Sequence, residues 1–120
     1  MLPANIANRI PNHDRITVRH LLNHSSDLFN YIDNERYEKE TFSKGTLDNF
    51  IDWAFGKDSK PPAFAPGTGF EYSDTNTIVA ELIVQQVTGN PLALEIRDRI
   101  LTPLGLKNTY MEVMLIQQAS

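Results

Sequence analysis

The chain has 120 residues, no cysteine and a formal net charge of −4, and 41% of its residues are hydrophobic. This length and composition fit one globular domain and argue against a disordered chain. Without cysteine these residues can form no disulfide, thiol nucleophile or thiolate metal site. The negative charge and the scattered basic residues argue against a nucleic-acid-binding face. No apolar run in the sequence is long enough to span a membrane.

The pattern of apolar residues predicts a mainly α fold with four to five helices. Residues 1–15 are rich in Asn and Pro and predict an extended N-terminal segment. Thr17 can cap a short helix over residues 18–24, because a hydroxyl at this position accepts a hydrogen bond from the first turn. A second helix is expected to begin near Thr46 and to end at Gly56.

The longest predicted helix begins at Ser73 or Asp74, either of which can cap it, and ends at Gly89. Asn90-Pro91 then predicts an N-cap followed by proline at the first helical position of another helix. Residues 111–120 are expected to form a frayed or strand-like tail. We therefore expect residues 1–120 to form a single helical domain or subdomain.

The most distinctive stretch is a turn that leads into the longest helix, Pro66-Gly67-Thr68-Gly69-Phe70-Glu71-Tyr72-Ser73-Asp74. The Pro-Gly turn and the second glycine predict a sharp bend, and a phenol follows just before the helix. This arrangement would place the Tyr72 hydroxyl at the edge of a site. Alternatively, Tyr72 packs as an interfacial aromatic with a wet hydroxyl, and Asp74 only caps the helix.

Three segments carry motifs in a recognisable order. Residues 16–28 read Ile-Thr-Val-Arg-His-Leu-Leu-Asn-His-Ser-Ser-Asp-Leu. Residues 64–73 contain Phe-Ala-Pro-Gly and then Phe-x-Tyr-Ser, and residues 87–109 contain Val-Thr-Gly and then Ile-x-x-Pro-Leu-Gly-Leu-x-Asn-Thr. Together they resemble the family of serine β-lactamases, D-Ala-D-Ala carboxypeptidases and related esterases, over roughly residues 10–110.

The resemblance implies a fold and a chemistry. The chain would be the helical subdomain of a hydrolase that cleaves an ester, amide or β-lactam through a serine acyl-enzyme. Tyr72 would be its proton-transfer residue, and Asp74 stands at the position of the family's Asn. An amide both donates and accepts hydrogen bonds, whereas a carboxylate only accepts, so Asp74 disfavours β-lactamase more than esterase activity. No cofactor is implied.

Two further motifs of that family are not found in these 120 residues. No serine is followed by lysine three positions later, so the nucleophilic Ser-x-x-Lys is absent, and so is the Lys-Thr-Gly or His-x-Gly strand. Lys44-Gly45-Thr46 has the letters in the wrong order. We therefore expect a fragment that is inactive alone, with Tyr72 titrating like a free phenol near ~10 because no lysine activates it.

The motifs identify neither a binding partner nor a cellular compartment. A small acyl substrate is expected only if missing segments complete the site, and self-association through exposed apolar faces is expected for a cut domain. The first residues lack a signal peptide, so the signal of an exported parent would lie upstream. The alternatives are a stand-alone helical interaction module and a chain that complements a separately supplied nucleophile segment.

The remaining polar clusters do not predict a metal site or a catalytic triad. His20 and His24 share the spacing of a metal pair, but no third ligand is evident, and we predict no metal site. In the alternative interpretation, one histidine packs and the other caps the helix end. Asp27 stands where the family has Gly, and Asp tolerates left-handed backbone, so the turn is expected to survive. Ser25, His24 and Asp27 imitate a triad in letters only, since sequence neighbours do not point at one another.

Overall fold

The computed structural model describes residues 2–40 and 46–111, and in these ranges every regular element is helical. The mainly α prediction is confirmed, although the described ranges contain six α-helices rather than four or five. They are α1 (Ala4–Ala7), α2 (Val18–Leu22), α3 (Glu35–Glu40), α4 (Leu47–Phe55), α5 (Asp74–Thr88) and α6 (Leu92–Ile96), with a 3₁₀ turn η1 (Tyr31–Asp33) and a π-helical turn η2 (Arg97–Leu101).

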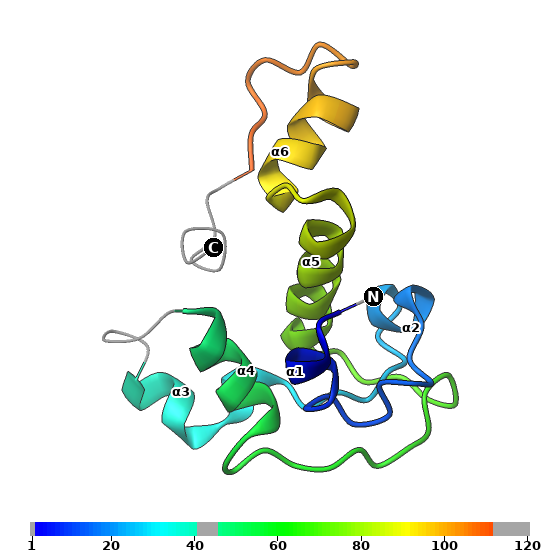
Figure 1. Ribbon diagram of the computed structural model, residues 1–120, viewed down its shortest axis with the longest axis vertical. Helices are drawn as coiled ribbons and strands as arrows, with labels where there is room; N and C mark the ends of the chain where they lie inside the picture. Colours follow the sequence, from blue (N-terminus) through cyan, green and yellow to red (C-terminus); the bar gives the residue numbers. More distant parts are fainter. Residues whose placement is uncertain (1, 41–45, 112–120) are drawn as a thin grey trace.

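Helix α5 is the central element of the molecule (Figure 1). Helix α2 lies to one side of its N-terminal half, α3 and α4 lie to the other, α1 overlaps its N-terminal end in this view, and α6 continues beyond its C-terminal end. Two buried apolar clusters meet on α5: one contains Ile10, Leu21, Leu28 and Val79, and the other contains Ile51, Ile78 and Leu82. Both clusters therefore pack against the N-terminal half of α5, which begins two residues after Tyr72.

The N-terminal segment departs from the prediction. Residues 1–15 were expected to be extended, but the described part contains the single turn α1, whose start is set by Pro3. The carbonyl oxygen of Pro3 accepts hydrogen bonds from the backbone N–H groups of Ile6 and Ala7 at 3.0 and 2.9 Å. Ile6 packs against both apolar clusters, so tertiary burial stabilises a helix too short to be stable alone.

The predicted N-cap Thr17 and the predicted helix start near Thr46 are both confirmed, and Thr46 is also an N-cap. The Thr17 hydroxyl accepts from the His20 backbone N–H at 3.2 Å, and Thr46 likewise accepts from Asn49 at 3.4 Å. In both cases the side chain of the third helical residue returns a bond to the cap, which completes a capping box. Helix α2 is shorter than predicted and ends at Leu22, because His24 has a left-handed backbone with φ 59°.

The end of α5 is as predicted and the start of α6 is not. Gly89 closes α5 in the left-handed region at φ 75°, where glycine is not strained. Pro91 is then the N-cap of α6 rather than its first helical residue. Asn90 does not cap it, because its side-chain amide donates to Glu95 Oε1 at 2.8 Å. The predicted tail at 111–120 lies outside the described residues except for Met111.

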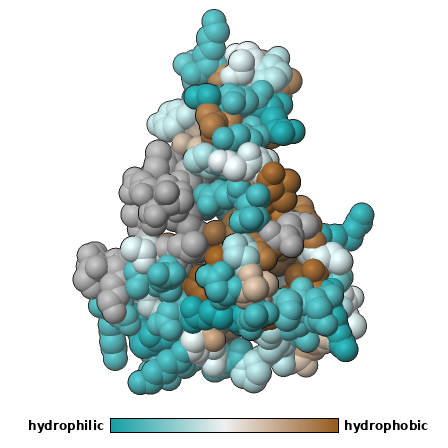
Figure 2. Space-filling model, in the orientation of Figure 1, coloured by the Kyte–Doolittle hydropathy of each residue, from teal (hydrophilic) through white to brown (hydrophobic). Residues whose placement is uncertain are grey.

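Large apolar side chains are exposed at several places on the described surface. Hydrophobic surface gathers around α5 in the middle of the molecule (Figure 2). Leu22, Phe70, Val87 and Leu104 are each 66–69% exposed. Self-association through such faces stays a prediction, which sedimentation at several protein concentrations would test. No helix in the described ranges has the length and apolar character needed to cross a bilayer.

Candidate functional site

The site around Tyr72 is built where the loop after α4 returns to the end of α2. The Gly67 N–H donates to the Ser25 carbonyl at 2.8 Å, and the Glu71 N–H donates to the His24 carbonyl at 2.9 Å. Gly67 has φ 85°, and a Cβ there would lie 2.9 Å from His20 Nε2. Glycine is therefore needed at this turn both for its backbone conformation and for its close approach to the histidine.

Asp27 holds the same loop from its other end. Its backbone is left-handed at φ 57°, as predicted from the family's glycine at this position. One carboxylate oxygen, Oδ2, accepts hydrogen bonds from the backbone N–H groups of Ala63 and Phe64. A glycine could adopt the same backbone conformation but could not bind these two N–H groups. Asp27 thus adds a clamp on the segment that leads to Tyr72.

The structure brings the two predicted site residues together. The Tyr72 hydroxyl donates to Asp74 Oδ1 at 2.7 Å, and Asp74 is the first residue of α5. This hydrogen bond, followed by the negative charge of Asp74 and partial burial, raises the pKa of the Tyr72 phenol above its usual value. The expectation that Tyr72 titrates like a free phenol is therefore wrong, because it did not include the neighbouring carboxylate. Tyr72 is therefore held as a proton donor toward a carboxylate. Ser73 occupies the N-cap position, but its side chain makes no capping hydrogen bond.

A second tyrosine lies near this pair. Thr75 in the first turn of α5 donates through its hydroxyl to the Phe29 carbonyl at 2.7 Å and accepts from the Tyr31 N–H at 3.0 Å. The pKa of Tyr31 is raised to about 12, first by burial and then by Tyr37, Asp74 and Tyr72. Burial therefore favours the neutral form of Tyr31, as the hydrogen bond to Asp74 does for Tyr72.

A polar network that was not predicted from the sequence lies behind Tyr72. Ser26 and Asn76 are fully buried, and the Ser26 hydroxyl donates to Asn76 Oδ1 at 2.5 Å. Asn76 Nδ2 lies 3.0 Å from His24 Nδ1, which also accepts from the Ser73 N–H at 3.3 Å. The available signal was the polar run Ser73 to Thr77 at the start of a helix that is otherwise apolar on its inner face.

Neither histidine lies in a metal cluster, since the described residues contain no group of three or more His, Cys, Asp or Glu able to hold an ion. His20 Nδ1 accepts from the Thr17 N–H at 3.1 Å, so its ring caps the beginning of α2. The alternative interpretation had placed a histidine cap at the end of the helix instead. Ser25 donates to Asn23 Oδ1 at 2.5 Å.

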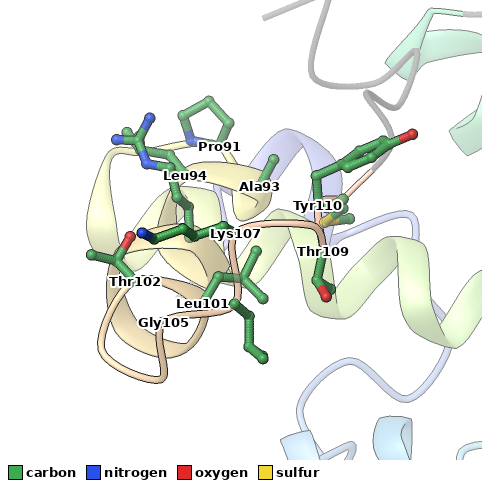
Figure 3. A pocket seen from close by; sticks show the side chains of 12 residues that line it. Pro91, Ala93, Leu94, Leu101, Thr102, Gly105, Lys107, Thr109 and Tyr110 are labelled. Carbon is green, nitrogen blue, oxygen red and sulfur yellow. The ribbon is translucent and has the colours of Figure 1, made fainter.

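A cavity of about 760 Å³ lies beyond the other end of α5. Figure 3 shows side chains from α6, η2 and the following segment around it, among them Leu94, Leu101 and Tyr110. Because α5 has 15 residues, its two ends are about 22 Å apart. The cavity is therefore separate from the site around Tyr72.

Comparison with known proteins places this arrangement in a family. A family model described as Beta-lactamase matches residues 2–119. The chain is 29% identical over 101 residues to Esterase EstB of Burkholderia gladioli, covering 78% of the chain and 25% of the esterase. It is 27% identical over 94 residues to Penicillin-binding protein 4* of Bacillus subtilis (strain 168), covering 78% of the chain and 21% of that protein.

Solved structures of two hydrolases are also similar to this chain. D-amino acid amidase from Ochrobactrum anthropi SV3 superposes with a TM-score of 0.69 at 28% identity, over 95% of this chain and 35% of the amidase. A D-stereospecific amidohydrolase from Streptomyces sp. superposes with a TM-score of 0.66 at 28% identity, over 80% of this chain and 30% of that protein. The chain spans 21–25% of the length of the curated relatives it matches. It belongs to the β-lactamase-like family of serine hydrolases.

Proposed function

We propose that this chain supplies the proton-transfer tyrosine of a hydrolase that cleaves a small ester or amide through a serine acyl-enzyme, and that these 120 residues alone do not turn over substrate. The observation that carries the proposal is the Tyr72–Asp74 hydrogen bond at the start of α5, inside the region that the family model matches. The sequence given contains no Ser-x-x-Lys, so the nucleophile would come from outside it.

The reaction assigns one role to each group. The serine oxygen, supplied from elsewhere, forms a bond to the substrate carbonyl carbon while the bond to the leaving group breaks. The proton released by the serine passes through the Tyr72 oxygen to the leaving group. Water then adds to the acyl-enzyme carbonyl, the bond from the acyl carbon to the serine oxygen breaks, and a proton from the water returns to that oxygen as the acid leaves. General acid–base help of this kind contributes about 10²–10⁴-fold to a rate.

Asp74 shapes the preference for substrate. Its carboxylate can only accept hydrogen bonds, and one oxygen already accepts from Tyr72. The carbonyl oxygen of an amide side chain or a β-lactam needs a donor, which the Asn usual at this position would supply. We therefore propose that esters are cleaved better than amides or β-lactams.

A chimaera tests the role of Tyr72 in an active context. Residues of this chain replace the 101 matched residues of the Burkholderia esterase, and hydrolysis of a p-nitrophenyl ester is measured. Tyr72→Phe should lower kcat by about 10²-fold or more, with circular dichroism showing an unchanged fold. Asp74→Asn should raise the relative rate on an amide. A folded Tyr72→Phe chimaera with the full rate would refute the assigned role.

The stand-alone interaction module stays the alternative. Its support is the exposed apolar surface, including Leu22 and Val87 at 66% each. The chimaera separates the two: a module unrelated to catalysis gives no dependence of hydrolysis on Tyr72.

A further inference from the structure

We propose that His24 is a positioning residue for Tyr72, and that it acts as a neutral imidazole whose proton is on Nε2. The catalytic meaning of the proposal rests on the proposed function, because that function makes Tyr72 the reacting group. The contacts that carry it do not depend on that function. They come from the end of α2, the segment before α5 and the first turn of α5.

His24 contacts the Tyr72 segment through both its backbone and its ring. The His24 carbonyl accepts from the Glu71 N–H at 2.9 Å. The imidazole lies against the Tyr72 ring, with centroids 4.5 Å apart and planes at 37°, and it meets the Phe70 ring edge-on at 6.2 Å. The imidazole therefore packs against one part of Tyr72, which is still 57% exposed.

The hydrogen-bond partners of the ring determine its tautomer. The Ser73 backbone N–H must be a donor, and it points to His24 Nδ1 at 3.3 Å. The second partner at 3.0 Å is Asn76 Nδ2, which is also a donor. With two donors directed at it, Nδ1 carries no proton, so the neutral ring is protonated on Nε2.

The orientation of the Asn76 amide is itself determined. Asn76 Oδ1 accepts from the Ser26 hydroxyl, and the Ser26 oxygen accepts from the Leu28 N–H at 3.3 Å. Reversing the amide would place its oxygen against His24 Nδ1, which accepts from the Ser73 backbone N–H and therefore has no proton to donate. Ser26, Ser73 and Asn76 are each 0% exposed, so bulk water cannot substitute for these bonds. The network thus fixes the ring in place.

Two supports then define the position of the phenol. The imidazole packs against the Tyr72 ring, and the Tyr72 hydroxyl donates to Asp74 Oδ1 at 2.7 Å. Without the imidazole, the exposed ring can rotate about its side-chain bonds, and the bond to Asp74 forms only part of the time. His24 therefore acts on the reaction through Tyr72 rather than by touching substrate.

A matched pair of variants separates positioning from folding. His24→Asn keeps a hydrogen-bond acceptor near the position of Nδ1, and asparagine tolerates the backbone conformation at φ 59°. It removes the ring that packs against Tyr72. His24→Phe keeps a ring but removes the acceptor from the Ser73 and Asn76 donors. The readout is the titration of Tyr72 in chains with ¹³Cζ-labelled tyrosine, assigned with Tyr72→Phe.

We expect folded His24→Asn to show a Tyr72 pKa lowered toward the free value of ~10, with a changed ring shift and a nearly unchanged unfolding midpoint. We expect His24→Phe to lower the unfolding midpoint more than His24→Asn does. A Tyr72 titration and ring shift identical to wild type in folded His24→Asn would overturn the proposal.

The wild-type chain provides a second measurement should either variant fail to fold. Long-range ¹H–¹⁵N spectra of His24 should show an unprotonated Nδ1 and a protonated Nε2 at neutral pH. A protonated Nδ1 would overturn the proposal. Neither readout uses turnover, so a folded Tyr72→Phe chimaera with the full rate would refute the proposed function while leaving the positioning role intact.

Discussion

Tyr72 and Asp74 are joined by a hydrogen bond of 2.7 Å in which the phenol donates and the carboxylate accepts. The family's usual Asn would offer an uncharged amide at this place, whereas Asp74 adds a negative charge beside the hydroxyl. Losing the phenolic proton would put two anions in contact. The bond to Asp74 is thus the first cause of the raised Tyr72 pKa.

Asp74→Asn is therefore predicted to lower the Tyr72 pKa toward ~10, the value of a free phenol. The shape of the side chain is kept, so the change isolates its charge. The measurement is a ¹³Cζ-tyrosine titration by NMR, with Asp48→Asn, a charge removal in the first turn of α4, as the control. A Tyr72 pKa that stays raised in Asp74→Asn would show that the carboxylate is not the cause.

Asp27 supplies a test of the loop clamp. Asp27→Gly keeps the left-handed backbone but loses the bonds to Ala63 and Phe64, so it should lower the free energy of unfolding by about 1–3 kcal/mol. Asp27→Ala loses the same bonds and also places an alanine at φ 57°, which should cost roughly 1–2 kcal/mol more. Urea unfolding measures both variants. Equal stability of Asp27→Gly and wild type would show that the clamp contributes nothing.

Local signals in the sequence predicted the elements that local chemistry determines. Thr17, Thr46 and Gly89 mark helix ends through hydrogen bonds within a few residues, and the structure has all three ends. Helix α1 could not be predicted this way, because burial of Ile6 against residues far along the chain stabilises it. Tyr72 and Asp74 lie within one short motif and were each proposed from it as site residues, but the hydrogen bond between them was not predicted.

The network behind that pair is different, because it joins residues far apart in the chain. Ser26 and Asn76 are 50 positions apart, and His24 and Asn76 are 52 apart. No spacing rule connects such residues. The buried contact between the end of α2 and the start of α5 brings them together, and that contact is a property of the tertiary fold.

Asn34 is predicted to be a key polar residue of the α3–α4 region. It is 2% exposed, its amide donates to the Trp53 and Lys57 carbonyls at 3.0 and 2.9 Å, and its oxygen accepts from the Arg36 N–H at 2.9 Å. Asn34→Ala leaves buried groups unpaired and should lower the free energy of unfolding by about 1–3 kcal/mol.

Asn34→Asp is the isosteric control for this position. It keeps the acceptor for Arg36 but directs a carboxylate oxygen at two carbonyls, so at neutral pH it should destabilise the chain at least as much as Asn34→Ala does. Chemical unfolding of both variants checks this. A stability equal to wild type in Asn34→Asp would mean that the amide donors are dispensable.

The raised pKa of Tyr31 makes the free energy of unfolding depend on pH in the alkaline range. Its pKa in the folded chain is about 12, and it is ~10 in an unfolded one. Its stabilising contribution is complete below pH ~10 and is lost as pH rises toward about 12, because the unfolded chain releases the proton first. We expect a loss on the order of 1 kcal/mol after allowance for solvent screening.

Comparison with Tyr31→Phe isolates this effect from the other titrating groups. Unfolding free energies of both chains are measured from pH 9 to 12. The difference between wild type and variant should change across this window in the direction stated. A difference that stays constant with pH would contradict the raised pKa of Tyr31.

The most direct test of the central claim is acyl transfer by the purified 120-residue chain. Hydrolysis of p-nitrophenyl acetate and of a chromogenic β-lactam is followed beside Tyr72→Phe, and mass spectrometry of the protein detects any covalent acyl group. The account predicts no rate above buffer and no acylation for either chain, because these residues carry the tyrosine but not the nucleophile. Stoichiometric acylation, or turnover that is lost in Tyr72→Phe, would contradict it and would reveal a nucleophile within the chain.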